Sequence, residues 1–209
     1  QVGYNIGLNQ RQWEVAKAPL GPKLLIPLAR EYGKFIRALN GKARKCLILD
    51  CDNTLWGGIL GEDGSTGIKL GLTYPGSSYQ NFQKQILNLY HRGIILAICS
   101  KNNEEDVLDV LENHEHMILK KHHFACLKIN WENKASNIAN IAKELNIGLD
   151  SLVFADDNEF ECDWIKSQLP EVKTLHMTGD PALFQNILIN PGYFESLFFS
   201  EEDKSKTEM

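Results

Sequence analysis

The sequence has no long hydrophobic run: no apolar stretch in its 209 residues approaches the roughly 18 residues that a membrane-spanning helix needs. It also contains no recognisable secretory signal, no internal repeat and no low-complexity segment. The net charge is only −5, and its negative sign gives no electrostatic footprint of a nucleic-acid-binding protein. We therefore expect an ordinary globular protein, with neither a membrane nor a nucleic acid as partner.

The five cysteines are odd in number and scattered, and three of them lie within or beside apolar runs. This usage does not fit a disulfide framework and favours a reducing compartment, so the expected location is the cytoplasm. The chain begins with Gln1 and ends in a charged run, 201–209. We expect it to be a piece excised from a longer, multidomain protein.

Four short apolar runs indicate buried strands, because they are unbroken rather than alternating. They cover 46–50, 94–100, 151–155 and 172–177. Helical patterns precede and separate them, at 25–39, 77–93, 103–112 and 138–145, with a capping box expected at Ser77 and Gln80. Strands that alternate with helices predict an α/β fold with a doubly wound parallel sheet, whose ligand site lies beyond the carboxyl ends of the strands.

The segments outside this pattern predict the domain organisation. Residues 1–44 precede the first strand and form either a helical appendage or the tail of a preceding domain, and residues 45–209 form the catalytic domain. The run 56–71 carries six glycines, which makes a helix unlikely there and favours a flap beside the site. The intervals between strands are too short for a large cap domain, so the site should stay open to a macromolecular substrate.

Acidic residues follow two of the predicted strands. Asp50 and Asp52 end the first, and the adjacent Asp156 and Asp157 end the third. Aspartate is also a common turn former, but carboxylates at one sheet edge are typical ligands of Mg²⁺. All four are candidate metal-site residues. We expect Asp50, the carbonyl of Asp52, and either Asp156 or Asp157 to bind the ion, with Asp156 favoured.

The polar residues near the same strand ends are candidates for phosphate binding. A hydroxyl and a helix N-terminus at a sheet edge can form a phosphate cradle, although an ordinary helix cap would look the same. Lys134, at the start of the helix after the loop Asn130–Asn133, could neutralise phosphate and an ionised nucleophile. The candidates are Asn53, Thr54, Ser100, Lys101, Asn102 and Lys134.

Together these signals resemble the four motifs of the haloacid dehalogenase (HAD) superfamily. They are Asp50-x-Asp52-x-Thr54, then Ser100, then Lys134, then Asp156-Asp157. The resemblance implies a HAD-like Rossmannoid fold with a flap, dependence on Mg²⁺, and phosphatase chemistry. In that chemistry Asp50 is the nucleophile and Asp52 the general acid and base.

A narrower resemblance, over residues 40–209, is to the FkbH-like family. It rests on the segments 50–58, 97–102, 129–131, 146–151 and 156–158. Such domains occur in polyketide assembly lines, among them the synthase for bryostatin. The resemblance implies transfer of a glyceryl unit from 1,3-bisphosphoglycerate, with dephosphorylation, to the phosphopantetheine thiol of an acyl carrier protein.

Cys51 lies between the two aspartates of the first motif and is the candidate nucleophile for such an acyl transfer. Its thiolate would attack the acyl phosphate, and the resulting thioester would pass to the carrier. Two observations favour an inert Cys51 in an Asp50-centred phosphatase. Many relatives carry leucine there, and in an ideal strand Cys51 points away from its neighbours. His176 is a possible base for the thiol.

Overall fold

The computed structural model describes residues 7–195. Contacts divide these residues into two units, one of residues up to Lys42 together with Glu195, the other of Ala43–Phe194. The division falls two residues from the boundary predicted at 44 and 45. The extent of the catalytic domain stays a prediction, because its expected last residues, 196–209, lie outside the described part of the chain.

The described part of the first unit includes the helices α2 (Gln10–Ala16) and α3 (Pro22–Leu39). Asn9 caps α2, where its side chain accepts a hydrogen bond from the backbone N–H of Gln12. Proline at the first position of α3 has no N–H to leave unsatisfied, which favours a helix start there. The helical pattern predicted at 25–39 is confirmed as the body of α3.

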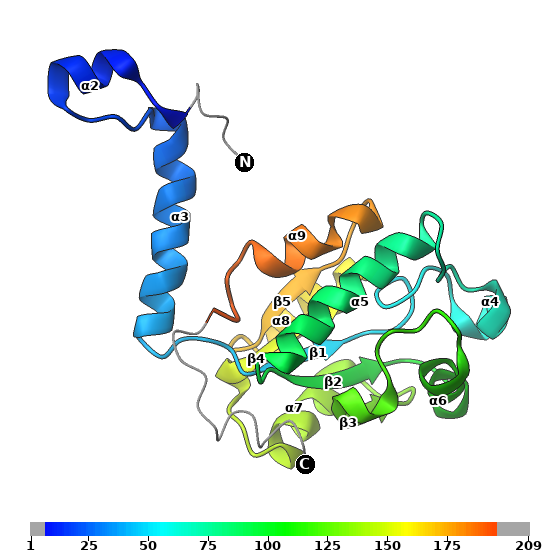
Figure 1. Ribbon diagram of the computed structural model, residues 1–209. Coiled ribbons are helices and arrows are strands. Elements are labelled where there is room, and N and C mark those ends of the chain that lie inside the picture. The colour runs from blue at the N-terminus through cyan, green and yellow to red at the C-terminus, as the bar shows by residue number, and fades with distance from the viewer. Residues whose placement is uncertain (1–6, 196–209) are drawn as a thin grey trace. The chain divides into compact units, whose positions relative to one another are not determined.

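The second unit is built on a five-stranded parallel sheet in the order β3-β2-β1-β4-β5 (Figure 1). The strands are β1 (Cys46–Leu49), β2 (Ile95–Ser100), β3 (Phe124–Ile129), β4 (Leu152–Asp156) and β5 (Lys173–His176). Four of them coincide with the four predicted runs. The fifth, β3, was not among those runs, because it is an edge strand in which buried and more exposed residues are mixed.

Helices cover both faces of this sheet (Figure 1). They are α4 (Leu60–Gly67), α5 (Gly76–His91), α6 (Glu104–Asn113), α7 (Lys134–Glu144), α8 (Glu159–Gln168) and α9 (Phe184–Ile189). Leu47 and Leu49 of β1 pack in one apolar core with side chains of α5, α6 and α9. Cys46 and Ile48 pack in a second core with side chains of α7 and α8. The predicted doubly wound α/β fold is confirmed, and its alternating side chains form two buried layers.

Two local predictions are wrong. The glycine-rich segment does contain a short helix, α4, because Asp63 accepts a hydrogen bond from the Ile59 N–H at its start and Leu60 is buried. Gly64 breaks that helix with a φ of +69°, a conformation that glycine adopts without steric cost. The capping box at Ser77 does not form, since α5 begins at Gly76 with no side-chain cap.

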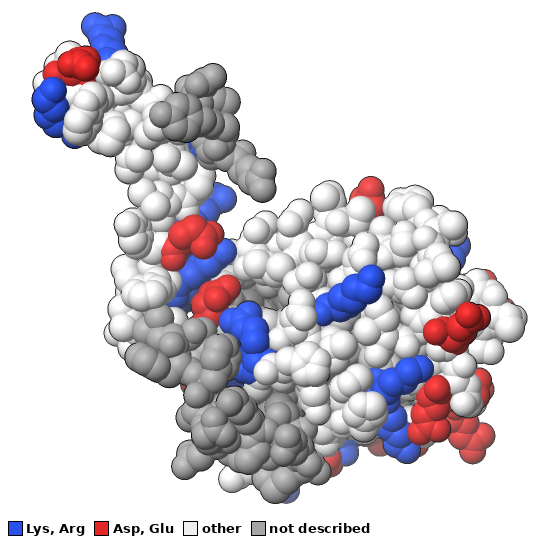
Figure 2. All heavy atoms as spheres, in the orientation of Figure 1, with Lys and Arg blue, Asp and Glu red and all other residues white. Residues whose placement is uncertain are grey.

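Other sequence expectations concern what the fold contains. Between β1 and β2 the chain forms only a loop, α4 and α5, so no large cap domain is inserted there. All five cysteines lie in the described part of the chain and are free and buried. None of the helices within residues 7–195 is long and apolar enough to cross a membrane. On the face drawn in Figure 2, charged side chains of both signs are interspersed over the described residues.

Candidate active site

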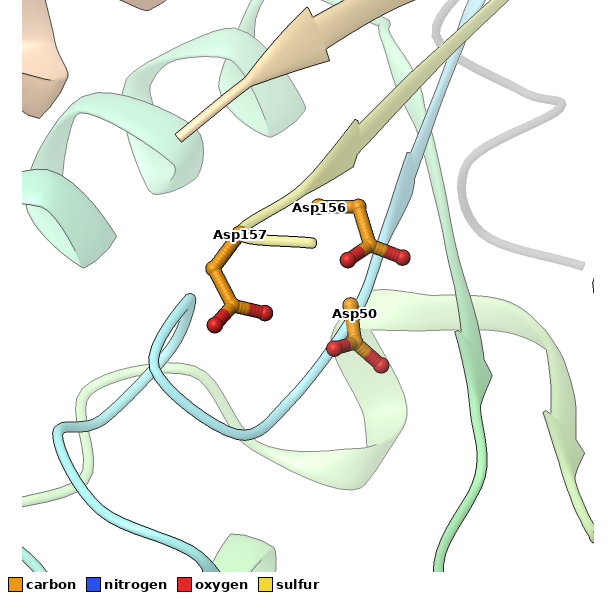
Figure 3. Close-up of side chains that lie close together, drawn as sticks. All are labelled: Asp50, Asp156 and Asp157. Atoms are coloured by element: carbon orange, nitrogen blue, oxygen red, sulfur yellow. The ribbon is translucent and has the colours of Figure 1, made fainter. Parts of the chain in front are cut away.

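Three carboxylates meet where β1 and β4 end (Figure 3). The two strands pair in parallel with Leu49 opposite Ala155, and the backbone N–H of Asp50 donates to the carbonyl of Ala155 at 2.9 Å. Asp50 therefore lies beside Asp156 and Asp157, and one oxygen of each carboxylate lies within 4.8 Å of the others. The sheet register thus brings together the acidic residues that the sequence placed at separate strand ends.

This acidic cluster is electrostatically strained. Asp50 and Asp156 are buried, and Asp157 is half-buried. Burial, followed by the charge of Asp50, raises the pKa of Asp156 to about 6. The same two causes raise the pKa of Asp157. Carboxylates held this closely favour a bound cation, which removes their mutual repulsion.

Lys134 supplies a positive charge to the acidic cluster from the first turn of α7. Asn133 caps α7 by accepting a hydrogen bond from the Ala135 N–H, and this fixes Lys134 at the first turn of the helix. Its ammonium lies 2.6 Å from Oδ2 of Asp156 and 3.0 Å from Oδ1 of Asp50, with only 5% of its side chain exposed. Burial alone would lower the pKa of Lys134, but the two carboxylates raise it above its usual value. Lys134 is therefore ionised at neutral pH.

The residues fit a divalent cation. Asp50, Asp156 and Asp157 bring three carboxyl groups to the site, whereas Lys134 is the buried ammonium that pairs with two of them, Asp50 and Asp156. Both oxygens of Asp156 are engaged, Oδ2 by Lys134 and Oδ1 by the N–H of Asn158. The carboxylate of Asp157 makes neither contact, although the side chain of Asn53 bonds to it. The preference for Asp156 drawn from sequence stays a prediction, and the ion pair of Asp156 with Lys134 favours Asp157 as the alternative ligand.

Asp52 is held apart from the acidic cluster by three donors. Its Oδ1 accepts from Nε1 of Trp56 at 2.9 Å and from the backbone N–H of Leu60 at 3.1 Å. Its Oδ2 accepts from Nδ2 of Asn102 at 2.9 Å. Burial raises the pKa of the Asp52 carboxyl, while these hydrogen bonds act in the opposite direction. A carboxyl with a raised pKa beside an ionised cluster is suited to general acid and base catalysis.

Cys51 does not have the environment of a nucleophile. It is fully buried, and it packs in the same apolar core as Leu47 and Leu49, since it continues their alternation along the strand. Burial and then the charge of Asp50 raise the pKa of the Cys51 thiol well above its usual value, although a hydrogen bond with Ser100 partly lowers it. A buried, protonated thiol does not attack a carbonyl. The burial of Cys51 therefore argues against its assignment as the catalytic thiol and favours the alternative of an inert core residue.

The two candidate phosphate ligands that follow Ser100 both contact carboxylates. The ammonium of Lys101 lies 2.6 Å from Oε1 of Glu161, on α8, and so forms an ion pair across the loop. The amide of Asn102 donates to Asp52. Both side chains are thus engaged by carboxylates, and their role in phosphate binding stays a prediction. Ser100 is buried at the end of β2 and remains a candidate.

The loop after the first motif is likewise internally bonded. Asn53 has a φ of +51°, and its side-chain oxygen accepts from the N–H of Gly58, while its own N–H donates to the Gly58 carbonyl. The N–H of Thr54 donates to the Cys51 carbonyl. In contrast, the buried Thr54 hydroxyl has no hydrogen-bond partner among the described residues. Of the two candidate phosphate ligands in this loop, Thr54 therefore keeps a free hydroxyl, whereas Asn53 shapes the loop.

His176 bonds to the backbone beside the acidic cluster, and no contact joins it to the thiol of Cys51 among the described residues. It ends β5, and its Nε2 makes a hydrogen bond of 2.9 Å with the backbone carbonyl of Asp157. This contact supports the loop that presents the Asp157 carboxylate. The proposed role of His176 as a base for Cys51 is thus replaced by a positioning role.

Sequence reasoning missed Trp56, whose indole contacts the carboxylate of Asp52. The available signal was its place four residues after Asp52, at the start of the glycine-rich segment. It also missed the role of Glu161 as the partner of Lys101.

The comparisons with known proteins agree with this geometry. The family model of the NLI interacting factor-like phosphatases matches residues 45–188. The N-terminal part of the protein BF1531 from Bacteroides fragilis, which contains a phosphatase domain and was crystallised with Mg, is 38% identical with a TM-score of 0.86. The match covers 94% of this chain and 53% of that one, so this chain spans about half the length of that relative.

More distant structures share little sequence. The HAD domain of the effector protein Lem4 from Legionella pneumophila is 18% identical, with a TM-score of 0.46 and coverage of 71% and 94% of the two chains. A HAD family enzyme from Bacteroides thetaiotaomicron is 14% identical, with a TM-score of 0.44 and coverage of 64% and 94%. No curated protein sequence matches this chain. On the family match and the acidic site that accompanies it, the chain belongs to the NLI interacting factor-like phosphatases of the HAD superfamily.

Proposed function

We propose that this domain is a Mg²⁺-dependent phosphohydrolase in which Asp50 is the nucleophile. The observation that carries the proposal is the juxtaposition of Asp50 with Asp156, Asp157 and the buried Lys134. A cation held by Asp50, the Asp52 carbonyl and Asp157 would neutralise the charge of the phosphoryl group during transfer. The Mg found with the Bacteroides fragilis phosphatase domain supports this choice of ion.

The residues of the chain divide the reaction into two steps. In the first, a carboxylate oxygen of Asp50 attacks phosphorus, the bond from phosphorus to the leaving oxygen breaks, and Asp52 gives that oxygen a proton. In the second, water attacks the phosphorus of the aspartyl phosphate and gives a proton to Asp52, the bond from phosphorus to the Asp50 oxygen breaks, and phosphate departs from the regenerated Asp50 carboxylate. Lys134 lies 3.0 Å from Oδ1 of Asp50 and would compensate negative charge as it develops on the phosphoryl group.

Release of phosphate from p-nitrophenyl phosphate tests this function. The wild-type protein should hydrolyse it with Mg²⁺ and stop when the metal is chelated. Asp50→Asn should lose activity by at least about 10³-fold, since a neutral amide is a poor nucleophile. Asp109→Asn is the matched control, because Asp109 lies on α6 and pairs only with Asn113 there. Full activity in Asp50→Asn would contradict the proposal.

Glyceryl transfer to an acyl carrier protein is a narrower proposal that rests on the FkbH-like resemblance. The absence of an inserted cap between β1 and β2 supports it, because an open site can receive a protein-borne pantetheine arm. The burial of Cys51 argues against a thioester on this residue. If the transfer takes place, we propose that the pantetheine thiol attacks the acyl phosphate of 1,3-bisphosphoglycerate directly, and that Asp50 removes the second phosphate. The domain would then act inside a cytoplasmic multidomain synthase.

A cluster of basic residues would suit the docking of an acidic carrier protein, but its place in the fold does not support that role. It consists of Lys120, Lys121, His122, His123 and Lys128. The first four precede β3, at the amino ends of the strands, whereas the acidic cluster lies at their carboxyl ends. A strand of six residues separates these edges by about 20 Å. Lys128 is paired with Glu144. The four residues that precede β3 therefore lie away from the active-site rim, and Lys128 is engaged by an acidic partner.

A further inference from the structure

The carboxylate of Asp52 is the best-bonded side chain of the site. Its three donors come from two segments that are far apart in sequence. Trp56 and the N–H of Leu60 belong to the loop and helix that follow β1, and Asn102 follows β2. Both side-chain donors are buried, Trp56 completely and Asn102 with 5% of its surface exposed. The carboxylate is therefore fixed between two loops and not free to rotate.

The donors are distributed unequally over the two oxygens. Oδ1 accepts two hydrogen bonds, from Trp56 and Leu60, which occupy both of its lone pairs. Oδ2 accepts one bond, from Asn102, and keeps one lone pair. Among the described residues no further donor reaches either oxygen. Oδ2 is therefore the atom of Asp52 that can carry a proton without losing a hydrogen bond.

We propose that Asn102 is a positioning residue that makes Oδ2 of Asp52 the proton-carrying atom of the reaction. This inference rests on the proposed phosphohydrolase function. As the bond from phosphorus to the leaving oxygen breaks, the proton on Oδ2 moves to that oxygen, and Asp52 is left as a carboxylate. In the second step Oδ2 takes a proton from the attacking water. The Asn102 amide holds the direction of the free lone pair through both steps.

The chemistry of the amide suits this role. Asparagine has donors in every protonation state of its neighbour, so Asn102 can bond to Oδ2 both before and after the proton leaves. It cannot itself exchange a proton with the substrate. Its place directly before the cap of α6 fixes its backbone, since Asn103 is the N-cap of that helix. Asn102 thus acts through Asp52, and its effect should depend on how strongly the leaving oxygen needs a proton.

Two substrates separate this role from a general loss of structure. The leaving group of p-nitrophenyl phosphate departs readily without a proton, whereas phenyl phosphate releases a phenol whose pKa is about 10, as for tyrosine. We expect Asn102→Ala to lower kcat/KM for phenyl phosphate about tenfold more than for p-nitrophenyl phosphate, a fraction of the full effect of a general acid. Trp56→Phe should give a smaller difference in kcat/KM between the two substrates, because Leu60 still donates to Oδ1.

Asn137→Ala is the matched control. Asn137 is as deeply buried as Asn102, and its amide donates to another asparagine, Asn130, and not to a carboxylate of the site. Loss of the Asn137 amide should change kcat/KM for the two substrates by the same factor. Equal losses for both substrates in Asn102→Ala would overturn the inference while leaving the phosphohydrolase function intact. Activity that survives Asp50→Asn would instead contradict the function.

A readout without turnover completes the test. In a crystal structure of Asn102→Ala, we expect the Asp52 carboxylate to rotate away from its present position, because Oδ2 has lost its only donor. In Asn137→Ala the carboxylate should stay in place. An unchanged Asp52 side chain in Asn102→Ala would overturn the positioning role, whatever the substrate of the domain.

Discussion

Replacement of Lys134 by methionine should be strongly destabilising, although it keeps most of the side-chain volume. The ammonium lies between Asp156 and Asp50 at 2.6 and 3.0 Å, and it is almost completely buried. Its removal leaves two carboxylates next to each other with no compensating charge. Breaking a buried ion pair in this way costs about 3–5 kcal/mol of the free energy of unfolding. That is a large part of the roughly 5–15 kcal/mol available to a domain.

The chain contains a control for this effect. Lys166 lies 2.7 Å from Asp163, a comparable distance, but more than half of each side chain is exposed. Exposed pairs contribute about 0–1 kcal/mol, so Lys166→Met should change stability little. The contrast between the two lysines isolates burial as the cause, because the contact distances are alike.

Urea unfolding at neutral pH without Mg²⁺ measures both variants. The double variant Lys134→Met with Asp156→Asn should recover part of the loss, since it removes one of the two uncompensated charges. At pH 5 the loss in Lys134→Met should shrink, because carboxyl groups with a raised pKa bind protons and the repulsion disappears. The reasoning is refuted if Lys134→Met is no less stable than Lys166→Met.

Three further predictions concern the metal and the thiol. Asp157→Asn should weaken Mg²⁺ binding at least about tenfold in calorimetric titration, the scale reached even by loss of indirect metal contacts. An unchanged affinity would exclude Asp157 as ligand. Because folding raises the pKa of Asp156 to about 6, its contribution to stability without Mg²⁺ is present below the unfolded pKa and lost as pH rises through 6. The increase in Tm on adding Mg²⁺ should therefore be larger at pH 7.5 than at pH 5, and the reverse order would contradict the assignment. Cys51→Ala should lower stability by roughly 1–2 kcal/mol, because the thiol is fully buried. It should leave the phosphatase rate within about twofold of wild type, and a larger loss would restore a catalytic role for the thiol.

The sequence predicted the acidic cluster because parallel strands bring their carboxyl ends to one edge. Asp50 and Asp156 lie at the ends of β1 and β4, and Lys134 begins α7. The hydrophobic pattern predicted the order of these elements, and the structure brings the three side chains together. The alternation of β1 also indicated that Cys51 points away from Asp50. Burial of Cys51 in the core with Leu49 is the consequence of that alternation.

The directions of side chains within loops could not be predicted from the sequence. Ser100, Lys101 and Asn102 are consecutive, yet the first is buried at a strand end, the second pairs with Glu161, and the third bonds to Asp52. Glu161 is 60 residues from Lys101 and Asp52 is 50 residues from Asn102 along the chain, so no local pattern reports either contact. The helix α4 was missed for a related reason, since its glycine content opposes a helix and its tertiary contacts override that preference.

The fate of the nucleophile tests the central claim most directly. The Asp52→Asn variant should accumulate the covalent intermediate, because it lacks the base that activates water. After incubation with Mg²⁺ and 1,3-bisphosphoglycerate and a rapid acid quench, mass spectrometry of peptides separates the two routes. We predict a phosphoryl group on Asp50 and an unmodified Cys51. A glyceryl-type adduct on Cys51, with no phosphoryl group on Asp50, would contradict the account.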